Sequence, residues 1–242
     1  MSLDDRIDAI FQRPADQGVS LAMVVVHHGD VVGERYGVQP ANIFEPEKVI
    51  TAESPLLSWS VAKSITHAAV GILGRIVGGG RDGMERFLRE RLFDPCGMTS
   101  AELRFDPTGT WVGSTYVFAT TRDFARFGEL YRNDGIAESG ERVVPAGWAD
   151  HGRTFVAHDA EGAGRYGFDY GRHWWMWPEF PGSIAAHGYE GQYIVVVPDR
   201  QLTLVHLGKT EHDQRPQLVA ALGELIETFP VTGASDIAGV AS

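Results

Sequence analysis

Ser60 and Lys63 have the residue types and the spacing that covalent catalysis requires. A serine hydroxyl is a weak nucleophile and needs a base beside it. A polar, turn-prone segment, residues 51–55, precedes the pair. An apolar run with helical spacing follows: Val61, Ile65, Ala68, Ala69, Ile72, Leu73 and Ile76. Ser60 should therefore lie at or just inside a helix N-terminus, with Lys63 one turn later on the same face.

The chemistry of this pair requires a neutral lysine amine, because a protonated amine cannot take up the serine proton. Burial and the positive end of a helix both favour the neutral form. The same helix end offers the Ser60 backbone N–H to a developing oxyanion.

A Ser-x-x-Lys match alone is a weak signal, and the plain alternative is a capping serine with a surface lysine. The cationic side chains are mostly Arg, and the only lysines are Lys48, Lys63 and Lys209. A lysine can serve as a base whereas an arginine cannot, although a GC-rich genome would also make lysine scarce. Lys63 is flanked by apolar helix positions, where a solvated lysine is less expected.

Composition and charge narrow the function classes. The 242 residues suffice for one large domain or two small ones, and the formal net charge of −11 argues against nucleic-acid and anionic-membrane partners. Cys96 is the single cysteine, so no internal disulfide can form, and we expect a buried structural thiol there. The acidic N-terminus does not resemble a signal peptide, and no apolar run reaches the ~18 residues of a spanning helix. We expect a cytoplasmic protein.

Hydrophobic periodicity predicts an α+β fold. The expected helices cover residues 3–12, 60–77, 84–93, 121–132 and 216–229, with a short one near 144–148. The expected strands cover residues 20–27, 31–37, 166–177, 183–187, 191–198 and 202–207. Residues 99–119 are expected to be irregular, and residues 120–123 resemble a capping box. This order predicts an antiparallel sheet built from N- and C-terminal strands and flanked by helices.

Three segments together resemble the serine β-lactamase and penicillin-binding protein family. They are residues 58–64 (SWSVAKS), 116–128 (YVFATTRDFARFG) and 186–198 (AHGYEGQYIVVVP), with smaller similarities at 93–98 and 140–145. The resemblance covers most of the chain. It is closest to the class C β-lactamase-related branch, which includes esterases, D-alanyl peptidases and 6-aminohexanoate-oligomer hydrolases. It implies a β-lactamase/transpeptidase-like fold.

The resemblance also implies residue roles. Ser60 would be the acyl-forming nucleophile and Lys63 its base, and the backbone N–H groups of Ser60 and Gln192 would form the oxyanion hole. A substrate would lie along the strand that carries the family's Lys-Thr-Gly motif, where this chain has residues 189–191. The substrate-binding candidates are Tyr116, His187, Tyr189, Glu190 and Gly191. For His187 a hydrogen-bonded strand residue is the alternative.

One family motif, Tyr-x-Asn, has no counterpart at its usual place after the Ser-x-x-Lys helix. At that place the chain passes directly from residues 72–73 to residues 74–77, without room for the segment that carries the motif in the family. We therefore expect a much reduced helical subdomain, with residues 60–92 as its remnant.

Two other letter matches are interpreted as decoys. Residues 131–133 (YRN) lie at the far end of the helix predicted over 121–132, and residues 209–211 (KTE) lack the glycine of Lys-Thr-Gly. Three alternatives remain for the missing tyrosine: its function is lost, Tyr116 or Tyr189 replaces it, or a segment is missing from the sequence.

We predict a serine hydrolase that forms an acyl-enzyme on Ser60, with one domain over residues 1–232 and a flexible tail over 233–242. Esters should be cleaved better than amides or β-lactams, because an alkoxide leaving group needs less protonation than an amine. Small-molecule esters, amides or β-lactams are the expected partners, with no cofactor and no metal; no oligomeric state is indicated. The alternative is a catalytically inactive family member retained as a binding or scaffold protein.

Overall fold

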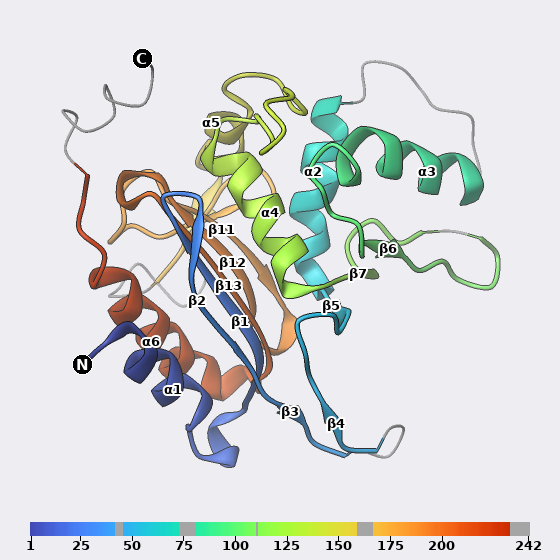
Figure 1. Ribbon diagram of the computed structural model, residues 1–242. Helices are drawn as coiled ribbons and strands as arrows, with labels where there is room; N and C mark the ends of the chain where they lie inside the picture. Colours follow the sequence, from blue (N-terminus) through green and yellow to red (C-terminus); the bar gives the residue numbers. More distant parts are fainter. Residues whose placement is uncertain (42–45, 73–80, 110, 159–166, 233–242) are drawn as a thin grey trace.

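The computed structural model describes residues 1–41, 46–72, 81–109, 111–158 and 167–232, with an eight-stranded sheet at the centre (Figure 1). The strands lie in the order β2 (Asp30–Tyr36), β1 (Val19–His27), β13 (Leu202–Lys209), β12 (Gln192–Val197), β11 (Ile184–Gly188), β10 (Trp175–Met176), β9 (Asp169–Tyr170) and β8 (Ala157–His158). All neighbouring pairs are antiparallel. The fold is α+β, and its sheet combines strands from both ends of the chain, as predicted.

Strands β1 and β13 join the two ends of the chain at the centre of the sheet. In their register Val24 pairs with Val205 and Val25 with Leu204. Because side chains alternate between the two faces, Val24 and Val205 belong to one apolar cluster and Val25 and Leu204 to the other. Burial on both faces explains why these two strands have nearly continuous apolar sequences.

Helices α1 (Leu3–Phe11) and α6 (Arg215–Glu227) cover one face of the sheet and lie side by side (Figure 1). Helix α1 begins with a capping box in which the side chains of Ser2 and Asp5 accept from each other's backbone N–H. Ile7 and Ile10 of α1 and Leu222 of α6 are buried against the sheet. Full burial of such a side chain contributes about 1.5–3 kcal/mol.

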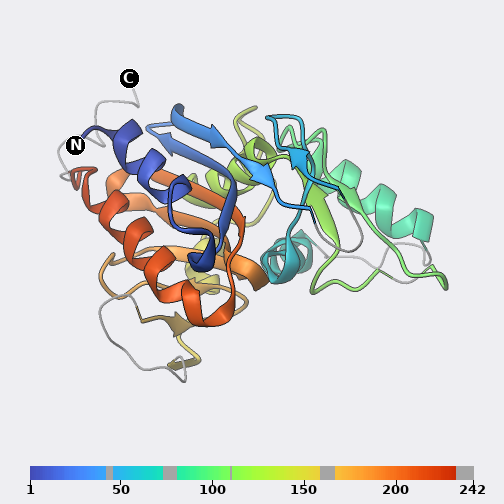
Figure 2. The ribbon, with the colours of Figure 1, turned by 90° about the horizontal axis from the view of Figure 1, so that it is seen from below.

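On the other side of the sheet, α4 (Thr121–Arg132) and α2 (Ala62–Ile72) contact its strands, and α2 carries Lys63 of the candidate site. The π-helical turn η3 (Arg89–Phe93) contacts α2 and follows α3 (Arg81–Leu88), and α5 (Trp148–Gly152) contacts α4. Figure 2 shows α2 beside the end of the large sheet, and α2 contacts β11. Helix α4 packs across β1, β12 and β13. Gly128 permits this close approach, because an added Cβ would lie 2.5 Å from Thr203 Cγ2.

Short elements connect these layers. A second ladder joins β5 (Leu56–Leu57), β7 (Val117–Ala119) and β6 (Glu102–Leu103), and a third pairs β3 (Val38–Gln39) with β4 (Lys48–Val49). The 3₁₀ turns are η1 (Ala15–Gln17), η2 (Trp59–Val61), η4 (Tyr189–Gly191), η5 (Pro198–Arg200) and η6 (His212–Gln214). No helix in the described ranges has the length and apolar character needed to cross a membrane.

Two predictions about secondary structure need correction. Residues 99–119 were expected to be irregular, but they contain β6 and β7, because strands of two or three residues are too short to produce a detectable period. The single strand expected over 166–177 is two two-residue strands, β9 and β10, separated by a turn. Residues 73–80, in the predicted helical remnant, and 233–242, the predicted tail, lie outside the described residues.

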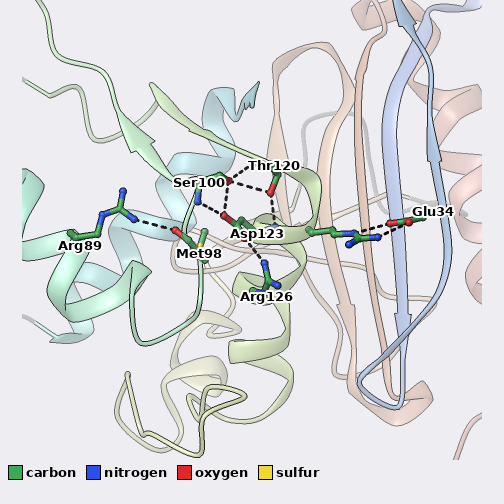
Figure 3. Close-up of polar contacts among 8 residues, drawn as sticks. Glu34, Arg89, Met98, Ser100, Thr120, Asp123 and Arg126 are labelled. Carbon is green, nitrogen blue, oxygen red and sulfur yellow. Dashed lines mark hydrogen bonds and ion pairs between the residues drawn. The ribbon is translucent and has the colours of Figure 1, made fainter. Parts of the chain in front are cut away.

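The start of α4 is held by a buried polar network, shown in Figure 3. Thr120 Oγ1 accepts from the Asp123 N–H, while the Thr120 N–H donates to Ser100 Oγ at 2.9 Å. Asp123 Oδ2 accepts from Ser100 Oγ at 2.6 Å and from Ser100 N at 2.8 Å, and Asp123 Oδ1 accepts from Arg126 at 2.5 Å. The capping box predicted over 120–123 is therefore only half formed, since Ser100 takes the place of its second arm.

Candidate active site

Ser60 and Lys63 lie within hydrogen-bond distance of each other at the start of the helical segment formed by η2 and α2. Ser60 Oγ lies 2.6 Å from Lys63 Nζ. Both residues are half-buried. In the described part of the chain no carboxylate forms an ion pair with Lys63. The geometry permits proton transfer from the Ser60 hydroxyl to a neutral Lys63 amine.

The chain that enters η2 is fixed by the small ladder. The Ser58 N–H donates to the Val117 carbonyl at 3.0 Å, one pair beyond the β5–β7 ladder. Tyr116, a predicted substrate-binding residue, directly precedes Val117 and is 42% exposed. Farther along, Thr66 Oγ1 of α2 donates to the Gly113 carbonyl. The segment carrying Tyr116 therefore lies against both the entry to η2 and the first turns of α2.

His173 is a residue of this region that sequence reasoning did not single out. Its Nδ1 lies 3.2 Å from the Lys63 carbonyl, and its own carbonyl accepts from Ser64 Oγ at 2.8 Å. A carbonyl oxygen only accepts, so Nδ1 must carry the proton in this bond. The two bonds fasten the turn between β9 and β10 onto the turn of α2 that holds Lys63. No sequence pattern indicated this contact, because 109 or more residues separate the partners.

A second contact ties the residue before the nucleophile to the end of the large sheet. Trp59 Nε1 donates to Glu190 Oε2 at 3.1 Å, and the Trp59 and Tyr189 rings meet edge to face with centroids 5.5 Å apart. Lys209 Nζ lies 3.6 Å from the same Glu190 oxygen. The backbone at Gly188 also packs closely against the backbone at Ser58, because a Cβ on Gly188 would lie 2.5 Å from the Ser58 carbonyl oxygen.

Left-handed backbone conformations gather around Ser60. Among the described residues, seven that are not glycine have a positive φ, and His28, Asp134 and Gln201 of these lie in turns at the ends of strands or helices. The other four are Trp59 (φ 45°), Tyr116 (61°), His173 (65°) and Glu190 (61°). Trp59 precedes Ser60, His173 bonds the Lys63 carbonyl and Glu190 bonds Trp59. Tyr116 precedes Val117, whose carbonyl accepts from the Ser58 N–H. Such conformations persist only where the surroundings impose them, and they are concentrated at functional sites.

Gln192 and Gly191 support the site through the backbone. The Gln192 side chain is buried and forms two hydrogen bonds with Gly208, donating from Nε2 at 2.7 Å and accepting at Oε1 at 3.0 Å. Gly191 has φ 80°, and its carbonyl accepts from His206 Nδ1 at 2.7 Å. Gly191 therefore shapes the turn before Gln192. The oxyanion hole formed by Ser60 N–H and Gln192 N–H stays a prediction.

His187 lies away from this site, which corrects its place among the substrate-binding candidates. Alternation along β11 puts Ala186 on the α2 face and His187 on the opposite face of the sheet. Its ring stacks on Trp175 at 5.1 Å and meets Phe168 edge to face at 4.2 Å. Burial, with a smaller contribution from Arg215, lowers the pKa of His187 to about 3. Within the described residues, His187 is held by these ring contacts, and no hydrogen bond of its side chain accompanies them.

The tyrosines do not restore the missing Tyr-x-Asn motif by direct contact. Among the described residues, neither Tyr116 nor Tyr189 forms a hydrogen bond with Ser60 or Lys63. Tyr189 is 53% exposed and open to solvent at the edge of the site. Tyr131, interpreted as a decoy, is buried in α4 and packs on Trp174 with centroids 4.5 Å apart. Its position in the core agrees with that interpretation.

Cys96 is the single cysteine of the chain and a second type of side chain that could act as a nucleophile. The thiol is buried near the end of η3, as expected from the sequence. Burial raises the pKa of the Cys96 thiol to about 12. A thiol in this state is a poor nucleophile.

The fold and the Ser60–Lys63 pair together define a β-lactamase-like architecture, and comparison with known proteins agrees. The beta-lactamase family matches residues 66–226, which is more than half of the chain. The chain belongs to this family. The match begins three residues after Lys63, so the assignment of Ser60 and Lys63 depends on the geometry described above.

The individual proteins that are similar to this chain include a named hydrolase and penicillin-binding protein homologues. Over 114 residues, 44% of this chain, the sequence is 29% identical to the 6-aminohexanoate-dimer hydrolase of Paenarthrobacter ureafaciens, and the aligned part spans only 28% of that protein. The octameric penicillin-binding protein homologue of Pyrococcus abyssi is similar in structure, with a TM-score of 0.68 and 12% identity over 94% of this chain and 78% of that one. A penicillin-binding protein homologue of Caulobacter crescentus has a TM-score of 0.68 and 10% identity over 93% and 98%. At these identities the structural matches establish the fold alone.

Proposed function

We propose that this protein is a serine hydrolase that forms an acyl-enzyme on Ser60. The observation that carries the proposal is the 2.6 Å distance between Ser60 Oγ and Lys63 Nζ at the start of a helix. Membership of a family that includes named hydrolases supports it.

In the proposed reaction, Ser60 Oγ attacks the carbonyl carbon of the substrate while neutral Lys63 accepts the hydroxyl proton. The carbonyl oxygen becomes an oxyanion, which the Ser60 and Gln192 N–H groups would bind. The leaving group departs with a proton, and water then hydrolyses the acyl-enzyme. Lys63 is the base in the first step and, once protonated, the available proton donor for the leaving group.

The substrate class follows from the missing tyrosine. An amine leaving group must be protonated as it departs, whereas an alkoxide or a phenolate needs less help. We therefore expect activated esters to be cleaved faster than amides or β-lactams. Turnover of a β-lactam faster than a p-nitrophenyl ester would contradict this ranking.

A labelling experiment tests the proposal directly. The wild-type protein and the Ser60→Ala variant are incubated with a fluorophosphonate and, separately, with a β-lactam, and each is weighed by intact-protein mass spectrometry. We expect the wild type to gain the mass of one adduct and the variant to gain none. Labelling of both would place the reactive group elsewhere, and labelling of neither would favour the alternative of an inactive binding or scaffold protein.

A further inference from the structure

Trp59 and Glu190 form a clasp between two strained points of the backbone. Both residues have left-handed conformations, with φ of 45° and 61°. This conformation is unfavourable for a residue other than glycine, so the surrounding contacts must hold each residue in it. The hydrogen bond from Trp59 Nε1 to Glu190 Oε2, 3.1 Å long, connects them across 131 residues of sequence.

Further contacts hold the Glu190 side of the clasp. The Glu190 carbonyl accepts from the Thr210 N–H at 3.0 Å, which ties its turn to the chain beyond β13. Lys209 Nζ lies 3.6 Å from Glu190 Oε2, the oxygen that also accepts from Trp59. A charged acceptor makes a stronger bond with an N–H donor than a neutral one does. Glu190 therefore serves as a fixed anchor to which Trp59 is attached.

The position of the clasp in the chain gives it a consequence for catalysis. Trp59 immediately precedes Ser60, and Glu190 lies two residues before Gln192. The clasp therefore links the two segments whose backbone N–H groups are the predicted oxyanion donors. Gln192 is itself immobilised through its side-chain bonds to Gly208. A displacement of Trp59 would move the Ser60 N–H and Oγ relative to this fixed partner.

We propose that Glu190 is a positioning residue, which holds Trp59 in its left-handed conformation and thereby sets the Ser60 hydroxyl and N–H against the Gln192 N–H. This inference rests on the proposed acyl-enzyme chemistry at Ser60. Glu190 acts here through Trp59 rather than by touching the substrate. Its role differs from that of the candidate substrate contact predicted from the sequence.

The test compares Glu190→Ala with Glu190→Gln, because glutamine keeps an oxygen that can accept from the indole N–H. Glu34→Ala is the matched control: Glu34 also accepts from a side chain distant in sequence, Arg122, but lies on strand β2 at the far edge of the sheet. The measurements are kcat and KM for p-nitrophenyl butyrate, the rate of fluorophosphonate labelling, and the melting temperature.

We expect Glu190→Ala to lower kcat and the labelling rate by about 10–100-fold, because small displacements of reacting groups have effects of that size. The KM should change less than about twofold, since binding contacts are kept. Glu190→Gln should recover most of the lost rate, and Glu34→Ala should behave like the wild type. The NMR signal of the Trp59 indole Nε1–H, assigned with Trp59→Phe, should shift in Glu190→Ala and return toward its original position in Glu190→Gln.

The outcomes separate this inference from the proposed function. Equal labelling rates in the wild type and folded Glu190→Ala would overturn the positioning role and leave the acyl-enzyme chemistry intact. A rate loss that Glu190→Gln does not recover, accompanied by a lower melting temperature, would mean that Glu190 only stabilises the fold. A wild type that takes no label at Ser60 would overturn the proposed function and with it this inference.

Discussion

The helical segments that begin at η2 and α4 each follow a strand of the small ladder, β5 and β7, and their first turns are used differently. At the start of α4, the Thr120 hydroxyl caps the backbone and the buried Asp123 carboxylate accepts three hydrogen bonds from side chains and backbone. At the start of η2, the Ser58 side chain makes no capping bond, and the Ser60 hydroxyl instead meets the Lys63 amine. A hydroxyl that satisfies the backbone is structural, whereas one paired with an amine is available for chemistry.

The backbone shows the same difference. Thr120 has an ordinary extended conformation with φ −66° and ψ 156°. Trp59 has φ 45°, a strained value for a bulky side chain. Strain that reduces stability is retained where it places a reactive group, and a relaxed cap is retained where only stability is needed. Changes at the start of η2 should therefore affect the reaction, and changes at the start of α4 should affect the fold.

The largest effect is expected from replacing Lys63. Lys63→Arg keeps a positive charge but removes the base, because a guanidinium does not lose its proton. We expect ester hydrolysis and fluorophosphonate labelling to fall by about 10³-fold, within the range for loss of a general base. The melting temperature should change little. Labelling at the wild-type rate in Lys63→Arg would show that another group activates Ser60.

A change at the start of α4 should have the opposite signature. Asp123→Ala leaves the Ser100 N–H and hydroxyl without their acceptor and removes the partner of Arg126. We expect the free energy of unfolding to fall by about 2–4 kcal/mol, measured by urea denaturation. The folded fraction should label at Ser60 at the wild-type rate. A slower labelling rate per folded molecule would couple the two helix starts and weaken the contrast between them.

The pH dependence of stability tests the turn before Gln192, because the side chain of His206 bonds the Gly191 carbonyl in that turn. The buried imidazole donates from Nδ1 to the Gly191 carbonyl and accepts at Nε2 from Ser20 Oγ, 2.9 Å away. Burial, slightly opposed by the bond to Gly191, lowers the pKa of His206 to about 4. Below about pH 6.5 the unfolded chain binds a proton that the native state excludes, so stability is complete above that pH and declines from 6.5 toward 4.

Urea denaturation between pH 7.5 and pH 4.5 measures this decline. Each such histidine contributes a slope of up to about 1.4 kcal/mol per pH unit, and His187 should add its own share. His206→Gln should reduce the slope of the unfolding free energy against pH, and the part of the slope that His187 contributes should remain. An unchanged slope in His206→Gln would mean that His206 titrates normally in the folded protein.

Much of this molecule could be predicted from local patterns, and the missing parts share a physical cause. The strands near both termini and the helices α1, α2, α4 and α6 have clear periods, and the Ser60–Lys63 spacing determines a contact one helical turn apart. Contacts between distant segments carry no such signal. The bond of Trp59 to Glu190, the turn of His173 on Lys63, and Ser100 as the second partner of Thr120 all depend on tertiary packing.

His187 shows the same limit of sequence patterns, here for the direction in which a side chain points. The resemblance predicted that a substrate would lie along the strand near residues 189–191, but the face on which each side chain lies depends on the register of β11. That register places Ala186 toward α2 and turns His187 away. A one-residue difference in register would exchange the two faces, so a motif match alone cannot decide which side chain reaches a substrate.

The smallest expected effect compares the two hydroxyls that precede the helix starts. Thr120→Ala removes a cap that accepts from the Asp123 N–H, and we expect a loss of about 1 kcal/mol. Ser58→Ala removes a hydroxyl that, among the described residues, bonds the neighbouring Trp59 carbonyl alone, at 3.2 Å, so the loss should be within about 0.5 kcal/mol. Chemical denaturation of both variants measures the difference. Equal losses would mean that the start of η2 is capped as firmly as that of α4, and the distinction between a structural and a reactive helix start would then depend on the lysine alone.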